Sequence, residues 1–434
     1  MNFDNLELKI KEKRATIGVI GLGYVGLPLV MRFIQKGFKS IGFDIDEQKI
    51  LQLRASNTYI KHILSSDIKK AFDLGFEVTS NYDQIDLVDV IIICVPTPLG
   101  MHNEPDLSYI LSTLDNIKER LRKNQLIVLE STTFPGTTEE EILPILKDLG
   151  FKIGKDFYLG YSPEREDPGN KEFSTKNIPK VVSGVSENCL SVVNSLYNSI
   201  IDETVPVSST RVAEMTKILE NIHRAVNIGL VNELKLIADK MNIDIYEVIK
   251  AASTKPFGFT PYYPGPGLGG HCIPIDPFYL SWKAKEYNIN TRFIELAGEI
   301  NTSMPNYVIN KIIEALNSSG KSIKFSKVIV LGLSYKKNID DLRESPSLRI
   351  IELLLNYGAE VFFSDPYFDE IPITRKFNYK IKSTDINKKT LNSADIIVLA
   401  TDHDSFNYEL IEKESNLIVD SRGRFKNSKK VIRA

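Results

Sequence analysis

The chain contains, near its N-terminus, the stretch Thr16-Ile17-Gly18-Val19-Ile20-Gly21-Leu22-Gly23-Tyr24-Val25-Gly26, and the fold follows from it. The apolar run before the glycines predicts a buried β-strand, and the residues from Leu27 to Lys36 predict a helix. A second predicted strand, Ser40-Ile41-Gly42-Phe43, ends at the acidic residue Asp44. Strand, glycine-rich turn, helix, strand and acid, in this order, are typical of a dinucleotide-binding unit.

The glycine-rich turn is expected to hold NAD through its backbone. Gly21 permits a tight turn, Gly23 lets a diphosphate approach, and Gly26 lets the helix pack on the sheet. The helix start adds N–H groups and the positive end of a dipole. Asp44 can accept hydrogen bonds from ribose hydroxyls and would repel a 2′-phosphate, which favours NAD over NADP. The cofactor-binding residues predicted from this turn are Gly21, Gly23, Tyr24, Val25 and Gly26.

Two further apolar runs, 89–95 and 125–130, predict buried strands that are followed by hydroxyl-bearing residues. Ligands of open α/β sheets bind outside the carboxyl ends of the strands. We therefore expect Thr97 to lie near the cofactor. Thr132, at the edge of its strand, is a candidate both for the cofactor site and for the active site.

Two segments further along carry weaker signals. Thr137 or Thr138, ahead of a pair of glutamates, suits a helix N-cap. The predicted strand 157–160 leads into a proline-flanked loop that contains Glu164 and Arg165. In a cleft, Glu164 would be a candidate acid or base and Arg165 a candidate anion contact, whereas on an open surface the pair would only be solvated.

The pattern from Arg211 to Met241 predicts one long helix, with apolar residues at helical spacing. Lys217 and Asn221 lie four residues apart on one face, where a solvated polar stripe is the alternative to a site. The length favours a spacer between domains or a dimer seam. Three shorter predicted helices complete a small helical middle domain: 245–252, 294–301 and 308–316.

The stretch Pro264-Gly265-Pro266-Gly267-Leu268-Gly269-Gly270-His271-Cys272-Ile273-Pro274-Ile275-Asp276-Pro277 suits neither helix nor strand and predicts a loop. Asp276 and Pro277 resemble an N-cap and first helical position, opening a helix from Phe278 to Tyr287. A thiol held just before a helix N-terminus suggests a reactive cysteine, although a buried, inert Cys272 is the alternative.

The opening pattern recurs in the last third of the chain, at 327–336, 360–365 and 394–401. Only Gly332 of the glycines remains, and lysines and Arg343 follow it, so this site suits phosphate through side chains. The predicted fold is therefore α/β, with two Rossmann-like doubly wound domains joined by a long central helix and a small helical domain. The expected boundaries are an NAD-binding Rossmann domain at 1–206, a central helical dimerisation domain with the cysteine loop at 207–318, and a C-terminal Rossmann-like domain with the phosphate-suited site at 319–434.

Bulk properties exclude several classes. The chain has 434 residues, 42% of them hydrophobic and 25% charged, as in ordinary globular proteins. A net charge of −2 offers no field for nucleic acid or an anionic membrane. The three cysteines lack metal-ligand spacing, no apolar signal region opens the chain, and no apolar run approaches the ~20 residues that span a bilayer. We expect a cytoplasmic protein without a metal.

Taken together, the motifs resemble the UDP-glucose/GDP-mannose dehydrogenases over essentially the whole chain. The resemblance is carried by the Gly-Leu-Gly-Tyr-Val-Gly turn, the hydroxyl turn, the Pro-Glu-Arg loop, the Lys-Asn pair, the cysteine loop and the last lysine-rich turn; these lie at 21–26, 130–137, 163–165, 217–221, 267–276 and 335–346. The family oxidises a sugar-nucleotide alcohol by four electrons to a uronic acid with NAD.

The resemblance implies roles for individual residues. It makes Cys272 the nucleophile of a thiohemiacetal and thioester route, with Lys217 and Asn221 stabilising the oxygen anion at C6. Asp276 would hold a water or tune Lys217, while Thr132 and Glu164 would position the reacting water. Lys336 would contact the UDP-sugar and Arg343 would reach the cofactor, with Arg422 a weaker candidate. The substrate-binding residues implied are Glu164, Arg165, Lys217, Asn221, Gly269, His271, Tyr335 and Lys336.

Substrate identity follows from departures within the motifs. UDP-glucose enzymes usually have Phe-Leu after the Pro-Glu and serine before the cysteine, whereas this chain has Arg165-Glu166 and His271. These resemble the branch acting on UDP-N-acetylhexosamines, with UDP-N-acetylglucosamine the best match and UDP-N-acetylmannosamine or UDP-glucose the alternatives. The products would feed capsule or O-antigen synthesis. A non-catalytic NAD-binding protein and a two-electron alcohol dehydrogenase are the rival functions, and a homodimer through the central helix is expected.

Overall fold

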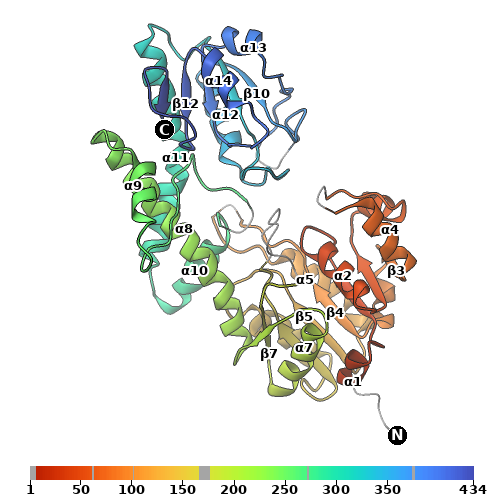
Figure 1. Cartoon of the computed structure of the whole chain (residues 1–434). Helices are drawn as coiled ribbons and strands as arrows, with labels where there is room; N and C mark the ends of the chain where they lie inside the picture. Colours follow the sequence, from red (N-terminus) through yellow and green to blue (C-terminus); the bar gives the residue numbers. More distant parts are fainter. Residues whose placement is uncertain (1–5, 61–62, 101, 166–175, 271–272, 374–376) are drawn as a thin grey trace. The chain divides into compact units, whose positions relative to one another are not determined.

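The computed structural model describes residues 6–60, 63–100, 102–165, 176–270, 273–373 and 377–434 (Figure 1). The N-terminal sheet is built from eight strands, β1 (Ile17–Ile20), β2 (Ser40–Phe43), β3 (Phe76–Thr79), β4 (Val90–Ile93), β5 (Gln125–Leu129), β6 (Phe157–Tyr161), β7 (Lys180–Gly184) and β8 (Thr204–Pro206). Their order is β3-β2-β1-β4-β5-β6-β7-β8. Strands β1 to β6 are parallel and in the order of a dinucleotide-binding sheet, while β7 pairs antiparallel to β6.

Both faces of this sheet are buried because successive strand residues enter two different cores. In β4, Val90 and Ile92 belong to one apolar cluster, and Ile91 and Ile93 to the other. Such strands are apolar throughout, which is why the sequence predicts them as continuous runs. The helices of this part are α1 (Leu6–Lys11), α2 (Gly26–Gln35), α3 (Glu47–Arg54), α4 (Ser65–Asp73), α5 (Ser108–Ile117), α6 (Leu143–Asp148) and α7 (Glu187–Asn198).

The C-terminal sheet repeats the design with five parallel strands, β9 (Lys327–Leu331), β10 (Glu360–Ser364), β11 (Ile396–Leu399), β12 (Ile418–Asp420) and β13 (Val431–Arg433), in the order β10-β9-β11-β12-β13. It carries the helices α12 (Pro346–Asn356), α13 (Lys388–Ser393) and α14 (Tyr408–Glu414). Alternate residues of β11 again enter two cores. The predicted α/β class with two Rossmann-like sheets is confirmed.

Between the sheets in sequence lie α8 (Thr210–Lys240), α9 (Ile245–Ala252), α10 (Asp276–Ala284) and α11 (Arg292–Ser318). The predicted end of the helix after the cysteine loop is wrong, because α10 stops at Ala284 and 285–287 form a 3₁₀ turn that ends in left-handed Asn288. The prediction of separate helices at 294–301 and 308–316 is also wrong. They form one helix, α11, that continues through Pro305.

Burial explains how α11 tolerates its proline. Pro305 has no N–H to donate, which costs about 3 kcal/mol in a helix interior. Residues on both sides of it are nevertheless buried, including Met304 and Val308 at 1% and 0% exposure. The apolar surface removed from water on both halves offsets the lost hydrogen bond.

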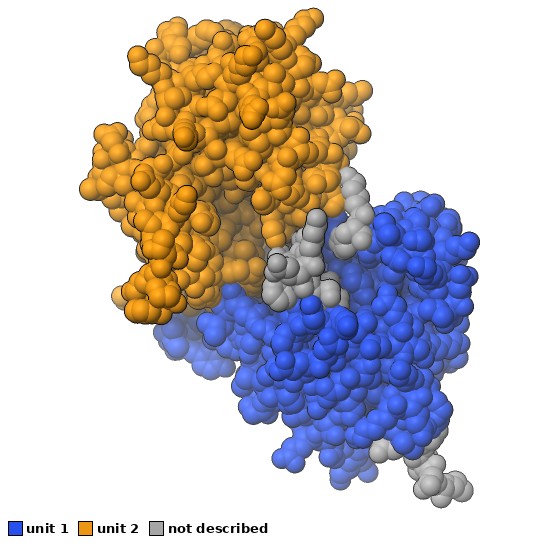
Figure 2. Space-filling model, in the orientation of Figure 1, with its two compact units in different colours: residues 1–220, 278–289 blue, residues 221–277, 290–434 orange. Residues whose placement is uncertain are grey.

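The chain divides into two compact units, one of Met1–Glu220 with Phe278–Ile289, the other of Asn221–Pro277 with Asn290–Ala434 (Figure 2). Helices α8 and α10 each contribute residues to both units. The division into three domains predicted from sequence stays a prediction.

Candidate active site

The glycine turn after β1 fits a dinucleotide. A Cβ on Gly21, whose φ is +91°, would lie 2.6 Å from the carbonyl oxygen of Cys94, and one on Gly26 would lie 2.0 Å from that of Gly21. A Cβ on Gly23 would meet no atom within 4 Å. The α2 N-cap, Val25, makes no side-chain capping bond. The turn is therefore tight where protein packs on it and open at a helix start suited to a diphosphate.

Asp44 joins the end of β2 to this turn. One carboxylate oxygen accepts hydrogen bonds from the Leu22 N–H at 2.9 Å and the Lys49 ammonium at 3.1 Å. The other oxygen accepts from the Asp46 N–H at 3.0 Å. The side chain is thus held in place beside the glycine turn, as the predicted ribose acceptor must be.

The ends of β4 and β5 are cross-linked by their hydroxyls. Thr97 Oγ1 donates to the carbonyl of Thr132 at 2.7 Å, and Ser131 Oγ donates to the carbonyl of Val95 at 2.7 Å. The Tyr279 hydroxyl of α10 donates to the carbonyl of Thr97. The two predicted threonines therefore lie together at the carboxyl edge of the sheet, the same edge as the glycine turn.

A buried glutamate, Glu214 of α8, fixes the turn that follows Thr132. Its carboxylate accepts hydrogen bonds from the Gly136 N–H at 2.6 Å, the Thr138 N–H at 2.9 Å and the Thr138 hydroxyl at 2.7 Å. Burial raises the pKa of Glu214 to about 7, although these hydrogen bonds oppose the shift. The predicted threonine cap is wrong, because Thr137 makes no side-chain capping bond and Thr138 turns its hydroxyl to Glu214.

Glu164, Arg165 and Lys217 are brought together beyond the end of β6. The Lys217 ammonium donates to the main-chain carbonyl of Glu164. The Glu164 carboxylate accepts from the Arg165 N–H at 2.6 Å. The Arg165 guanidinium donates to the carbonyl of Pro179 at 2.7 Å and pairs with Glu220 at 2.6 Å. The loop is therefore held on α8 rather than merely solvated.

A buried charged residue that the sequence predictions missed, Lys180, lies close to Glu164. Lys180, 5% exposed, donates to Glu130 at 3.1 Å and to the carbonyl of Pro163 at 3.3 Å, and lies 3.9 Å from a Glu164 oxygen. The Tyr197 hydroxyl donates to the other oxygen of Glu130. Burial alone would lower the pKa of Lys180, but the two carboxylates outweigh it and raise that pKa.

This cluster arises from strand direction. Because β7 runs antiparallel to β6, its first residue stands at the edge where β5 and β6 end. The sequence contains two signals for this cluster. Lys180 is a charged residue at the start of an apolar strand, and Glu130 is a charged residue at the end of another.

In the second unit, glycines of the cysteine loop pack against the turn after β9. A Cβ on Gly269 would lie 2.3 Å from that of Tyr335, and one on Gly270 would lie 3.0 Å from the Tyr335 ring. The Gly270 N–H donates to the carbonyl of Arg343 at 2.8 Å. The predicted residues His271 and Cys272 lie outside the described residues.

Asn221 and Asp276 also lie together in this unit. Asn221 Nδ2 donates to the Asp276 carboxylate at 2.5 Å, and its oxygen accepts from Arg224. Asp276 is the first residue of α10 and is fully buried. A buried carboxylate held by an amide is thus available to the site predicted here.

The remaining predicted residues surround the turn after β9. The Arg343 guanidinium donates to both oxygens of Asp341, at 2.7 to 3.0 Å. Arg422 donates to the carbonyl of Ala400 at 2.7 Å, and its guanidinium would be 2.9 Å from a Cβ on Gly265. Lys336 occupies the tip of the turn itself.

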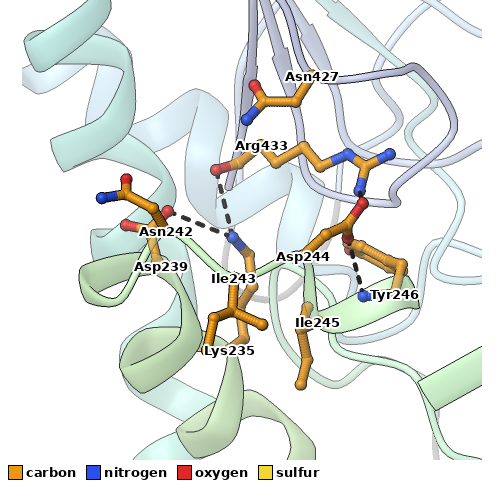
Figure 3. A pocket seen from close by; sticks show the side chains of 9 residues that line it. All are labelled: Lys235, Asp239, Asn242, Ile243, Asp244, Ile245, Tyr246, Asn427 and Arg433. Carbon is orange, nitrogen blue, oxygen red and sulfur yellow. Dashed lines mark hydrogen bonds and ion pairs between the residues drawn. The ribbon is translucent and has the colours of Figure 1, made fainter. Parts of the chain in front are cut away.

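A separate pocket of about 140 Å³ lies where α8 and α9 meet β13 (Figure 3). Its charges pair with one another: Arg433 with Asp244, and Lys235 with Asp239 at 3.7 Å. None of the predicted site residues lines it. The Arg433–Asp244 pair and a hydrogen bond of 3.3 Å from the Lys235 ammonium to the Arg433 carbonyl attach the C-terminal strand to the helices of the second unit.

None of the helices in the described residues is long and apolar enough to cross a membrane. Within the same part of the chain, no group of three or more histidines, cysteines, aspartates or glutamates is arranged to hold a metal ion.

Comparison with known proteins places the chain among one set of enzymes. Models of the UDP-glucose/GDP-mannose dehydrogenase family match in order: the NAD binding domain at residues 15–201, the central domain at 211–303 and the UDP binding domain at 329–427.

Individual relatives match along nearly their full lengths. Protein CapL of Staphylococcus aureus is 38% identical over 94% of this chain and 95% of its own. A UDP-N-acetyl-D-glucosamine 6-dehydrogenase of Pseudomonas aeruginosa is 36% identical over 91% of this chain and 92% of its own. The solved structure of a UDP-D-ManNAc dehydrogenase from Pyrococcus horikoshii has a TM-score of 0.86 at 33% identity, covering 96% of this chain and 98% of that one.

Proposed function

The chain belongs to the UDP-glucose/GDP-mannose dehydrogenase family and is an NAD-dependent oxidoreductase, and from this premise we propose its reaction and substrate. The reaction is the four-electron oxidation of the C6 alcohol of UDP-N-acetylglucosamine to the uronic acid. The observation that carries it is the gathering of Thr97, Thr132, Glu164 and Lys217 at the sheet edge that also bears the glycine turn. A hydride acceptor and groups able to handle protons thus share one edge.

The second oxidation needs a nucleophile because an aldehyde does not readily transfer its remaining C6 hydrogen as a hydride. The adduct that a nucleophile forms at C6 does so. NAD, when bound, supplies the hydride acceptor for both oxidations. Loss of a hydride from C6 and of the proton from its hydroxyl gives the aldehyde; the Cys272 thiolate attacks it, and protonation of the C6 oxygen completes a thiohemiacetal. Loss of a second hydride and proton gives a thioester. Water then cleaves the C–S bond, which releases the carboxylate and restores the thiol.

The other residues stabilise charge and handle water. Lys217 and Asn221, one helical turn apart on α8, stabilise the oxygen anion that forms at C6. Asp276, held by Asn221, holds a water or tunes Lys217. Thr132 and Glu164 position the water that hydrolyses the thioester.

The UDP-sugar is held by the second unit's lysine-rich turn. Lys336 contacts the UDP-sugar, and Tyr335, Gly269 and His271 are proposed as further substrate-binding residues. Arg343 contacts the cofactor. The proposal also places the protein in the cytoplasm, because the mechanism needs Cys272 as a free thiol.

Support for the N-acetylglucosamine substrate comes from Arg165 and His271 in the motifs and from the Pseudomonas relative. UDP-N-acetylmannosamine is the second candidate, because the Pyrococcus enzyme is similarly close in sequence and fold. NADH release measured with UDP-N-acetylglucosamine, UDP-N-acetylmannosamine, UDP-N-acetylgalactosamine and UDP-glucose tests the choice. We expect the highest kcat/KM with the first. A preference for UDP-glucose would overturn the acetylhexosamine assignment.

The thioester route is tested by Cys272→Ser. We expect this variant to stall after the first oxidation or to lose nearly all turnover. Full activity would exclude the thioester, and a wild-type protein that binds NAD but oxidises none of these sugars would point to a non-catalytic role.

We further propose that α8 forms the seam of a homodimer. Along α8, and at Met241 just after it, the large apolar residues that remain 39% to 62% exposed are Val212, Met215, Leu219, Leu230, Leu234, Ile237 and Met241. Their spacing puts them on one face, and a contiguous apolar stripe of this kind suits a second copy of the same helix.

A further inference from the structure

The turn after β9 is anchored to the sheet through an acid, as is the turn after β1, but that acid also meets a histidine. Asp365, at the end of β10, accepts from the Leu333 N–H at 2.6 Å and the Ser334 N–H at 3.3 Å. It is the counterpart of Asp44, which accepts from Leu22 in the first sheet. In the second sheet His403 Nε2 lies 3.1 Å from the Asp365 oxygen that bonds Leu333.

Both ring nitrogens of His403 are engaged, and their partners define its protonation. The Asn338 N–H donates to Nδ1 at 2.9 Å, so Nδ1 carries no proton. The ring proton is therefore on Nε2 and is donated to Asp365. His403 is 0% exposed, so water cannot replace either partner.

Asn338 is tied to the same segment by its side chain. Its Nδ2 donates to Asp404 at 2.6 Å, and the Asp404 N–H donates to its Oδ1 at 3.0 Å. Asn338 adopts a left-handed conformation, φ +61°, which asparagine tolerates better than most residues. Three hydrogen bonds thus hold one end of the tip Lys336–Asn338 on residues 403–404.

We propose that His403 is a positioning residue for Lys336: its Nδ1 acceptor holds the Asn338 N–H, and with it the turn that carries Lys336, in place for UDP-sugar binding. The inference rests on the proposed role of Lys336 at the UDP-sugar. Without an acceptor at the Nδ1 position, the Asn338 N–H would lose its partner, and only the two hydrogen bonds with Asp404 would hold this end of the turn.

The groups around the ring come from three segments. Asp365 and Tyr367 follow β10, and the Tyr367 ring packs edge-on at 5.3 Å. Asp404 and Phe406 lie on the histidine's own segment, with the Phe406 ring 5.6 Å away. From the turn, Lys337 lies 3.6 Å from Asp404. Among the described residues, Asp365 is the one charged group in hydrogen-bond contact with the ring.

Two substitutions separate the contacts of His403. Asparagine places an acceptor near the Nδ1 position and so keeps a partner for Asn338, whereas glutamine places an amide near Nε2 and so keeps the partner for Asp365. Both remove the ring, so loss of packing is common to the two. Dissociation constants for UDP-N-acetylglucosamine and for NAD are measured by calorimetry, each ligand alone, at about pH 8.

For His403→Asn we expect a dissociation constant for UDP-N-acetylglucosamine close to that of wild type. For His403→Gln we expect this binding to be roughly fivefold weaker, the loss expected for one hydrogen bond. NAD binding should be unchanged in both. Equal weakening in the two variants would overturn the proposal, because it would show that only the lost ring matters.

The proposed function fails differently. If wild-type protein binds no UDP-N-acetylhexosamine, or if Lys336→Ala binds it as wild type does, then the assignment of Lys336 is wrong and the role of His403 falls with it. If Lys336→Ala weakens binding while His403→Gln does not, only the positioning role is wrong.

Discussion

Two glycines of the cofactor turn differ in what surrounds them, and this separates folding from binding. Gly26→Ala would place a methyl 2.0 Å from the carbonyl oxygen of Gly21, so we expect it to lower stability and to abolish measurable NAD binding. Gly23→Ala meets no protein atom, so its unfolding temperature should stay at the wild-type value while NAD binding weakens at least tenfold. Thermal unfolding and calorimetric NAD titration check both. Unchanged NAD affinity in Gly23→Ala would show that the diphosphate lies elsewhere.

Lys180 is expected to matter through the charge it neutralises. Lys180→Met leaves the buried carboxylate of Glu130 without its cation, which should cost about 3–5 kcal/mol of unfolding free energy. Lys180→Arg should recover most of this, and the double variant Lys180→Met with Glu130→Gln should be more stable than Lys180→Met alone. Chemical denaturation measures all three. A Lys180→Met protein as stable as wild type would show that the pair contributes nothing.

The junction of α8 with the hydroxyl turn gives stability a pH dependence. Burial raises the pKa of Glu214 from its usual 4.5 to about 7, so the folded state binds a proton that the unfolded chain has lost. The contribution of Glu214 to the free energy of unfolding is fully present below about pH 4.5. It decreases as the pH rises above that value and is lost once the pH has passed about 7. The loss amounts to about 3 kcal/mol.

Glu214→Gln does not titrate and isolates this effect. The difference in unfolding free energy between wild type and variant should become less favourable to wild type between about pH 5 and about pH 8. Denaturant titrations at both pH values measure it. A difference that is constant with pH would contradict the shifted pKa.

Elements buried on both faces were predictable, and contacts between distant elements were not. The strands predicted from sequence, β1, β2, β4, β5, β6, β9, β10 and β11, are largely apolar runs, as strands with both faces in a core are. The strands β3, β7, β8, β12 and β13 were not predicted. The sequence predicted two helices where the structure has the single helix α11, because Pro305 usually ends a helix. The burial that stabilises the helix on both sides of Pro305 depends on residues far away in the sequence. Glu214 and Lys180 went unnoticed because Gly136 and Thr138 lie 76 or more residues from Glu214, and Glu130 lies 50 residues from Lys180. Thr97, Thr132 and Glu164 of the candidate site could be named from sequence because each follows a predicted strand. Lys217 could be named because it shares one face of a predicted helix with Asn221.

The exposed stripe on α8 predicts the state of assembly. Glutamate at Leu230 and Leu234 together would put charges into the proposed seam, so we expect the double variant to be a monomer by light scattering while wild type is a dimer. Leu149→Glu, at a leucine of similar exposure away from α8, should remain dimeric. A monomeric wild type at micromolar concentration would exclude the seam.

The most direct test of the proposed reaction is the count of electrons removed from each sugar. A fixed, limiting amount of UDP-N-acetylhexosamine is consumed with excess NAD, and the NADH formed is measured by absorbance. The thioester route predicts two NADH for each sugar and a uronic acid product by mass spectrometry. One NADH for each sugar, with an aldehyde as product, would contradict it.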